Sequence, residues 1–246
     1  MPDRNAPAFL AARSARRGRG AFSLIELLVV IGVIVLLAGM SFPAMTAIKI
    51  AQARSRARAE LTHIETAIET YKTKLGFYPP DNAPNWTANQ LYYELMGTRL
   101  TTIGGQQAYQ TLDGSAQIAT SAFPAAFPGG KVTGFMNTSK AGAGDDAPIA
   151  VKFLTGLKPA QFLAATSPVT STVLGVSMAG SPLFTGPNNG EIVPYGYNSS
   201  DLQRLHNPKT FDLWVDIIAG GKTNRISNWS TRPIFVYYTS LATSYP

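Results

Sequence analysis

The chain has no cysteine and only two histidines among its 246 residues. The absence of cysteine excludes disulfide bonds and thiolate metal sites, so any stability outside the cytoplasm must come from core burial or bound ions. His63 and His206 are too few for a histidine-rich metal centre, and neither lies in an H-E-x-x-H arrangement.

Sequence motifs typical of enzymes are also lacking. Residues 175–180 approach the G-x-S-x-G nucleophile elbow, but Ala179 stands where the pattern needs glycine. Residues 142–146, Gly-Ala-Gly-Asp-Asp, are too short for a dinucleotide-binding fingerprint and are interpreted as a turn. We therefore expect no enzymatic activity.

Charge is nearly absent from one segment close to the N-terminus. Between Arg19 and Lys49 there is no basic residue and one acidic residue, Glu26. An apolar helix of about 20 residues is what the hydrocarbon core of a bilayer requires, so we expect residues 22–50 to span a membrane. A carboxylate within such a segment indicates a function. The alternative is an interfacial glutamate that the positive N-terminus of the helix tolerates.

The residues before the apolar run distinguish it from a secretory signal peptide. A signal peptide has its small cleavage-site residues after the apolar run, whereas Gly20 and Ala21 precede it here. Residues 21–26, Ala-Phe-Ser-Leu-Ile-Glu, resemble the class III leader of type IV pilins and type II secretion pseudopilins. In that family a small residue, mostly glycine, is followed by Phe-Thr-Leu-Ile-Glu. The resemblance implies a cleaved leader at 1–21, prepilin peptidase cleavage between Ala21 and Phe22, and N-methylation of Phe22.

The resemblance also implies residues that act in subunit assembly. Glu26 would meet the N-terminal amine of a neighbouring subunit, and Leu24 and Ile25 complete the matching motif. Pro43 lies where many members of the family carry a helix-kinking proline.

The net charge of +7 is mostly a property of the leader. Residues 1–21 hold five arginines and one aspartate, which leaves 16 basic and 13 acidic residues from Phe22 onward. Residues 75–246 hold ten basic and nine acidic residues. The globular part therefore lacks the basic excess of a nucleic-acid-binding protein.

Apolar residues at helical spacing continue beyond the apolar run. Their intervals of three and four predict an amphipathic helix over 51–75 that packs against the protein's own sheet. Gly76 and the prolines after it are expected to end this helix. The members of the stripe are Leu61, Ile64, Ile68, Tyr71 and Leu75.

Residues 76–246 are expected to form a globular head. Thr87 is predicted to be the N-cap of a short helix ending at Met96, with Gln90 completing a capping box. Residues 98–190 form a low-charge insertion whose topology the sequence does not predict. Two strands are expected within it, at 151–154 and 169–176.

The C-terminal part contains a second resemblance. Residues 211–218 alternate in polarity and predict a half-buried strand with Asp212, Trp214 and Asp216 on its polar face. With Pro-Tyr-Gly-Tyr before it and Ile-Ser-Asn-Trp after it, the strand is similar in order and spacing to the C-terminal pattern of pseudopilins.

Major pseudopilins of this pattern bind calcium in the loop before the final Asn-Trp, which makes that loop a candidate calcium site here. In this chain the loop carries Lys222 and Arg225 in place of acids. Calcium takes about 6 to 8 oxygen ligands, and its affinity follows their charge. The alternative is that the two aspartates form a solvated strand face. The remaining candidate ligands are Asp212, Asp216, Asn224 and Asn228.

The predicted fold is α+β and type IV pilin-like, with a long N-terminal transmembrane and amphipathic helix packed on an antiparallel β-sheet head. The resemblance implies a structural subunit of a type II secretion pseudopilus, which polymerises through this helix to drive protein export across the outer membrane. It implies as partners the membrane, other pilin-like subunits, a prepilin peptidase, and an inner-membrane assembly platform with its ATPase. The implied location is the bacterial inner membrane, as a single-pass protein with a periplasmic head. The alternatives are a type IV pilus subunit, for adhesion, motility or DNA uptake, and a membrane-anchored module that never polymerises.

Overall fold

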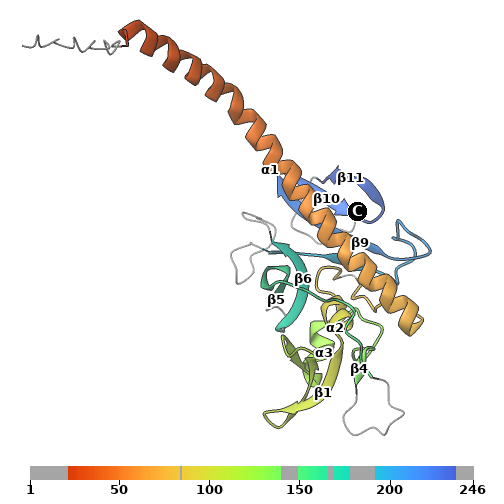
Figure 1. Cartoon of the computed structure of the whole chain (residues 1–246). Helices are drawn as coiled ribbons and strands as arrows, with labels where there is room; N and C mark the ends of the chain where they lie inside the picture. The colour runs from red at the N-terminus through yellow and green to blue at the C-terminus, as the bar shows by residue number, and fades with distance from the viewer. Residues whose placement is uncertain (1–21, 84, 140–148, 166–168, 178–191, 237–246) are drawn as a thin grey trace, which may run out of the picture. The chain divides into compact units, whose positions relative to one another are not determined.

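The computed structural model describes residues 22–83, 85–139, 149–165, 169–177 and 192–236, without the side chains of 40–44 (Figure 1). The chain is α+β, with a long N-terminal helix and sheets in which antiparallel pairing dominates. It divides into two compact units, residues 1–45 and 46–246.

Helix α1 (Leu24–Leu75) has 52 residues and contributes to both units. In the first unit, its large apolar side chains from Leu24 to Leu37 are between 50% and 81% exposed. Within the described ranges, no helix is long and apolar enough to cross a membrane. This finding contradicts the expected membrane-spanning segment at 22–50 and the expected inner-membrane location.

In the second unit, α1 buries one face. Leu61, Ile68 and Tyr71 are fully buried and Ile64 nearly so, while Leu75 is partly buried. This confirms the predicted amphipathic stripe. The helix ends as expected at Gly76, whose φ of 89° is in the left-handed region that favours glycine. The Gly76 amide donates to the Lys72 carbonyl at 2.8 Å.

The C-terminal part of the head is an antiparallel sheet in the order β11-β10-β9-β8, which includes the predicted strand at 211–218. Figure 1 shows the second half of α1 lying along this sheet. Both faces of β9 are buried, so the prediction that the strand is only half-buried was wrong. The strands are β8 (Gly196–Asn198), β9 (Asp212–Ala219), β10 (Lys222–Ser227) and β11 (Ser230–Phe235).

The 98–190 region contributes most of two further sheets. One has the order β3-β2-β1-β4, with β1 and β4 parallel, and the other has the order β5-β6-β7. The predicted strand at 169–176 corresponds to β6. The strands are β1 (Thr98–Ile103), β2 (Gln106–Thr111), β3 (Gln117–Ala119), β4 (Thr138–Ser139), β5 (Phe162–Ala165), β6 (Ser171–Ser177) and β7 (Ile192–Pro194). The short helices of the region are η1 (Thr120–Ala122), α3 (Phe123–Ala126) and η2 (Pro159–Gln161).

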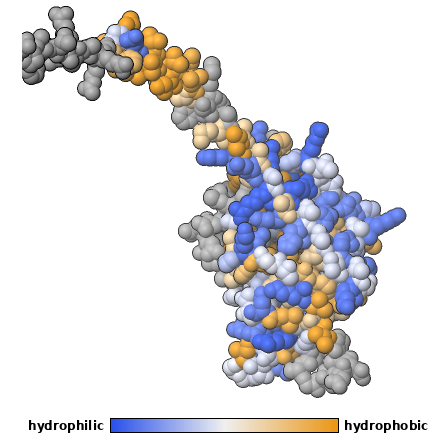
Figure 2. Space-filling model, viewed as in Figure 1, coloured by the Kyte–Doolittle hydropathy of each residue, from blue (hydrophilic) through white to orange (hydrophobic). Residues whose placement is uncertain are grey.

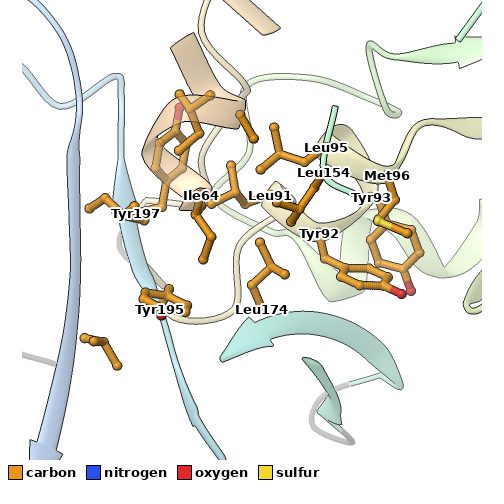
Figure 3. Close-up of a cluster of buried hydrophobic side chains, with 14 of the residues drawn as sticks. Ile64, Leu91, Tyr92, Tyr93, Leu95, Met96, Leu154, Leu174, Tyr195 and Tyr197 are labelled. Carbon is orange, nitrogen blue, oxygen red and sulfur yellow. The ribbon is translucent and has the colours of Figure 1, made fainter. Parts of the chain in front are cut away.

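One core joins these elements. Figure 3 shows Ile64 of α1, Leu91 of α2 (Leu91–Met96) and Leu174 of β6 meeting in this core. Leu213, Val215 and Ile217 of β9 belong to the same cluster. The second half of α1 therefore forms one side of the core of the head.

Two local predictions were wrong. Helix α2 begins at Leu91 and not at Thr87, because the Asn89 side chain accepts the Leu91 amide at 3.1 Å. Residues 151–154 are not a strand. Their backbone amides donate instead to Asn137 Oδ1 and to the Leu95 carbonyl, so they pair with no neighbouring strand.

Candidate functional site

The start of α1 is closed by a capping box that joins Ser23 and Glu26. The Ser23 amide and hydroxyl donate to Glu26 Oε2 at 2.8 and 2.9 Å, and the Glu26 amide donates to Ser23 Oγ at 3.3 Å. The Ser23 carbonyl accepts the Leu27 amide, which makes Ser23 the N-cap. The Ser-x-x-Glu spacing that identifies such a box is visible in the sequence.

Glu26 is thus a charged group with a defined position at the end of an apolar helix. The hydrogen bonds from the Ser23 backbone and hydroxyl hold the pKa of the Glu26 carboxyl below its usual value, so it is ionised at neutral pH. All its hydrogen bonds from Ser23 end at Oε2. In the described part of the chain, Oε1 therefore remains able to accept a further donor.

The other residues of the predicted cleavage and assembly site differ in what the structure says of them. Phe22 lies two residues before Leu24, the first residue of α1, and is 86% exposed. Leu24 and Ile25 lie in the first turn and are 81% and 70% exposed. Ala21 and the side chain of Pro43 lie outside the described residues.

Beyond the cap, the first half of α1 has an apolar surface on all sides. Figure 2 shows hydrophobic side chains covering this part of the helix. Glu26 is the one charged residue between Phe22 and Gly39. Monomeric soluble proteins rarely expose a contiguous apolar patch of this kind, and such patches mark interaction surfaces.

In the second half of α1, two arginines tie the helix to the C-terminal sheet. Arg54 donates through Nε and Nη2 to Asn224 Oδ1, at 3.0 and 2.7 Å. Arg58 donates to the backbone carbonyls of Ser227 and Ser230, one on each side of the turn between β10 and β11. These bonds connect α1 to a side chain of β10 and to the backbone at both ends of the β10–β11 turn.

Two of the four candidate calcium ligands carry the negative charge, and both are engaged. Asp216 accepts Arg225 Nε and Nη2 at 2.7 and 2.8 Å. Asp212 accepts the His206 amide and Nδ1 through Oδ2, at 2.7 and 2.9 Å, and the Asn207 amide through Oδ1. His206 in turn stacks on Trp229, with ring centroids 4.2 Å apart.

The two asparagines of the candidate site are also engaged, at separate places. Asn224 Nδ2 donates to the Ala219 and Lys222 carbonyls, and its Oδ1 accepts Arg54. Asn228 Oδ1 accepts the Leu213 amide, and Asn228 Nδ2 donates to the Phe211 carbonyl.

This arrangement does not fit calcium. The carboxylate oxygens that would bind the ion are occupied by a guanidinium, an imidazole and backbone amides. Across the described ranges, no group of three or more histidine, aspartate or glutamate side chains could hold a metal ion. The alternative interpretation, a solvated strand face, was also wrong, because Asp212 is 0% and Asp216 only 9% exposed.

A buried carboxylate that sequence reasoning did not single out lies at Glu94 in α2. Its Oε1 accepts the Met136 amide at 2.8 Å, and its Oε2 accepts the Asn137 amide and the Tyr71 hydroxyl at 3.0 and 2.9 Å. Burial raises the pKa of Glu94 to about 7, although these three donors act in the opposite direction. Glu94 thereby joins α1, α2 and the segment before β4.

Comparison with models of known protein families, with curated proteins and with solved structures finds no match for this chain.

Proposed function

We propose that this chain is a pilin-like structural subunit of a filament, of the type II secretion pseudopilus kind. Copies polymerise through the first half of α1, and growth of the filament drives protein export across the outer membrane. The observation that carries the proposal is an ordered apolar helix surface, 50% to 81% exposed from Leu24 to Leu37, with one capped carboxylate in its first turn.

The exposed surface needs a partner, and that partner is the same helix of a second copy. Burying apolar side chains yields about 25 cal/mol for each Å² removed from water, which favours association of these helices. Identical subunits that associate through different surfaces form open helical filaments when the rotation does not close a ring. An exposed apolar helix that continues into a packed head fits such a heterologous contact.

Glu26 supplies the specificity of that contact. After cleavage before Phe22, each copy would carry a free α-amino group close to the start of α1. An ionised carboxylate with one oxygen open can accept this ammonium from a neighbour, and an ion pair away from water is selective for copies in the correct register. The resemblance of residues 21–26 to the prepilin leader adds a prepilin peptidase and an ATPase-driven assembly platform as partners.

The first experiment determines the mature N-terminus by mass spectrometry of the protein from its native cells. A chain that begins at N-methylated Phe22 supports processing by the pilin pathway. An uncut leader contradicts the proposal.

The second experiment separates the cap from the docking charge. Glu26→Leu removes the charge and the glutamate half of the capping box, Glu26→Gln keeps an oxygen for Ser23 but removes the charge, and Ser23→Ala removes the serine half of the box but keeps the charge. Filaments are sheared from cells, pelleted and quantified, and proteins in the culture medium are compared. We expect both Glu26 variants to lose filaments and export, and Ser23→Ala to retain most of both. Unchanged filament yield in Glu26→Leu contradicts the proposed role of Glu26, and absence of filaments from the wild-type chain contradicts polymerisation.

A further inference from the structure

Charge is segregated along the second half of α1. Residues 49–58 carry one lysine and three arginines and no acid, whereas residues 60–69 carry three glutamates and no lysine or arginine. Glu60 is paired with Arg56 of its own helix at 2.9 Å. The other two glutamates, Glu65 and Glu69, form no ion pair among the described residues.

Glu65 and Glu69 lie one turn apart on the same side of α1, where two like charges repel each other. Burial raises the pKa of Glu65, and the neighbouring Glu69 raises it further, against the attraction of Arg58. The Tyr78 hydroxyl, at 3.3 Å or more from the carboxylate, is the neutral partner of Glu69. The hydroxyls of Thr66 and Thr70 donate to carbonyls of their own helix. The two carboxylates are therefore the acceptors that this side of α1 presents.

Two cations gather around one exposed ring near the other end of this half of α1. The Arg54 guanidinium lies 5.8 Å and the Lys222 ammonium 5.5 Å from the centroid of the Phe235 ring, which is 51% exposed. Neither cation pairs with an acid in the described ranges. Cation–π contacts hold the two positive groups in place but do not neutralise them.

The two sites cannot meet within one copy. Arg54 and Glu69 are 15 residues apart on one helix, which at about 1.5 Å per residue is about 22 Å. When two parallel copies are displaced along the helix axis by about that distance, the basic pair of one copy lies level with the acidic pair of the other.

We propose that the Arg54–Lys222 pair of one copy docks on the Glu65–Glu69 pair of an adjacent copy. This contact rests on the proposed filament. It is a second interface in that filament, formed by the heads and separate from the apolar packing of residues 24–37. A helical filament gives each subunit several neighbours, so this contact and the one at Glu26 can belong to different neighbours. Both like-charged pairs are neutralised on assembly, which fixes the axial offset between copies.

Cysteine cross-linking tests the contact directly, because the natural chain has no cysteine. Cells co-express one copy carrying Glu69→Cys and one carrying Lys222→Cys, and filaments are oxidised before electrophoresis. We expect a cross-linked dimer. A matched pair, Thr102→Cys with Lys222→Cys, places the first thiol on the exposed β1 strand and is expected to stay monomeric. A single chain with both Glu69→Cys and Lys222→Cys cannot close internally, since a disulfide needs Cα atoms within about 7 Å.

Charge reversal provides the second test. Glu69→Lys alone and Lys222→Glu alone are each expected to reduce the amount of pelleted filament, and the double variant to restore it. Unfolding of the purified variants by heat separates an assembly defect from a folding defect. If the wild-type chain forms filaments but no cross-link appears and neither reversal changes their yield, the head contact is wrong and the filament proposal stands. If the wild-type chain forms no filaments, both proposals fail.

Discussion

Arg225 lies directly opposite Asp216 in the paired strands β10 and β9, and its guanidinium holds both oxygens of the carboxylate. Arg225 is 3% exposed and also lies over the Trp214 ring, at 5.7 Å. The strand pairing therefore brings a buried cation of the chain itself to the aspartate.

Arg225→Met is expected to destabilise the head by about 3 to 5 kcal/mol, because it leaves the mostly buried Asp216 charge without its partner. Urea unfolding followed by tryptophan fluorescence measures the change. Arg232→Met, at an exposed position of β11, is the control and is expected to change stability by less than about 0.5 kcal/mol. Similar losses in the two variants would show that the pair with Asp216 contributes little.

Calcium is expected to leave the thermal stability of the wild-type chain unchanged. The oxygens of Asp212 and Asp216 already accept hydrogen bonds from His206, Asn207 and Arg225. Melting is compared in excess calcium and in excess chelator, with magnesium as the control for ionic strength. A rise in the melting temperature specific to calcium would contradict this prediction.

Glu94 is expected to make stability depend on pH. Its pKa is raised from 4.5 to about 7 in the folded chain, so between these values the folded state holds a proton that the unfolded state has released. The stabilisation is complete below pH 4.5 and is lost as the pH rises through about 7, by about 3 kcal/mol in all.

Urea unfolding at several pH values between 4.5 and 7.5 measures this fall. Glu94→Gln removes the titrating group and is expected to flatten the dependence, whereas Glu69→Gln on the exposed side of α1 keeps it. A fall of the same size in Glu94→Gln would assign the effect to a different group.

Gly196 is expected to tolerate no side chain. It pairs with Trp214 across β8 and β9, and a Cβ built on it would lie inside contact distance of the indole ring. Gly196→Ala is expected to destabilise the head by about 1 to 3 kcal/mol through overpacking. Because the clash is with one ring, the double variant with Trp214→Leu is expected to lose less than the sum of the two single variants. Simple additivity in thermal or urea unfolding would contradict this account.

The sequence predicts the amphipathic helix well because one physical factor decides it. Residues such as Leu61 and Ile68 repeat with the helical period, and burial of that stripe against a single apolar layer follows. The chain also carries a signal for the hairpin of β1 and β2, since Gly104 and Gly105 both have positive φ in its turn. The strands beside them are rich in threonine and glutamine and lack clear alternation, so they were not predicted.

The candidate site is less predictable. The residues that bind its side chains are distant in the sequence, or their local pattern was interpreted differently. Alternation in β9 indicates two faces, but whether Asp216 is solvated depends on Arg225 in the next strand. The Ser23 and Glu26 spacing indicates a capping box, but the charge of Glu26 in an apolar run was interpreted as a docking charge or as an interfacial glutamate, and not as part of a cap. Burial of Glu94 depends on the segment around Met136, whose position no local pattern indicates.

The second half of α1 forms one side of the core of the head, and this determines where the chain can be shortened. Composition suggests a boundary at Gly76, where the helix ends, but a fragment starting there would lose Leu61, Ile68 and Tyr71 from its core. It would also lose Arg58, whose donors serve the carbonyls of the β10–β11 turn. The compact unit that contains the head begins at Thr46, inside α1. The first half of this continuous helix is exposed, and its second half is part of the core of the head. A fragment that contains the folded head must therefore retain the second half of α1.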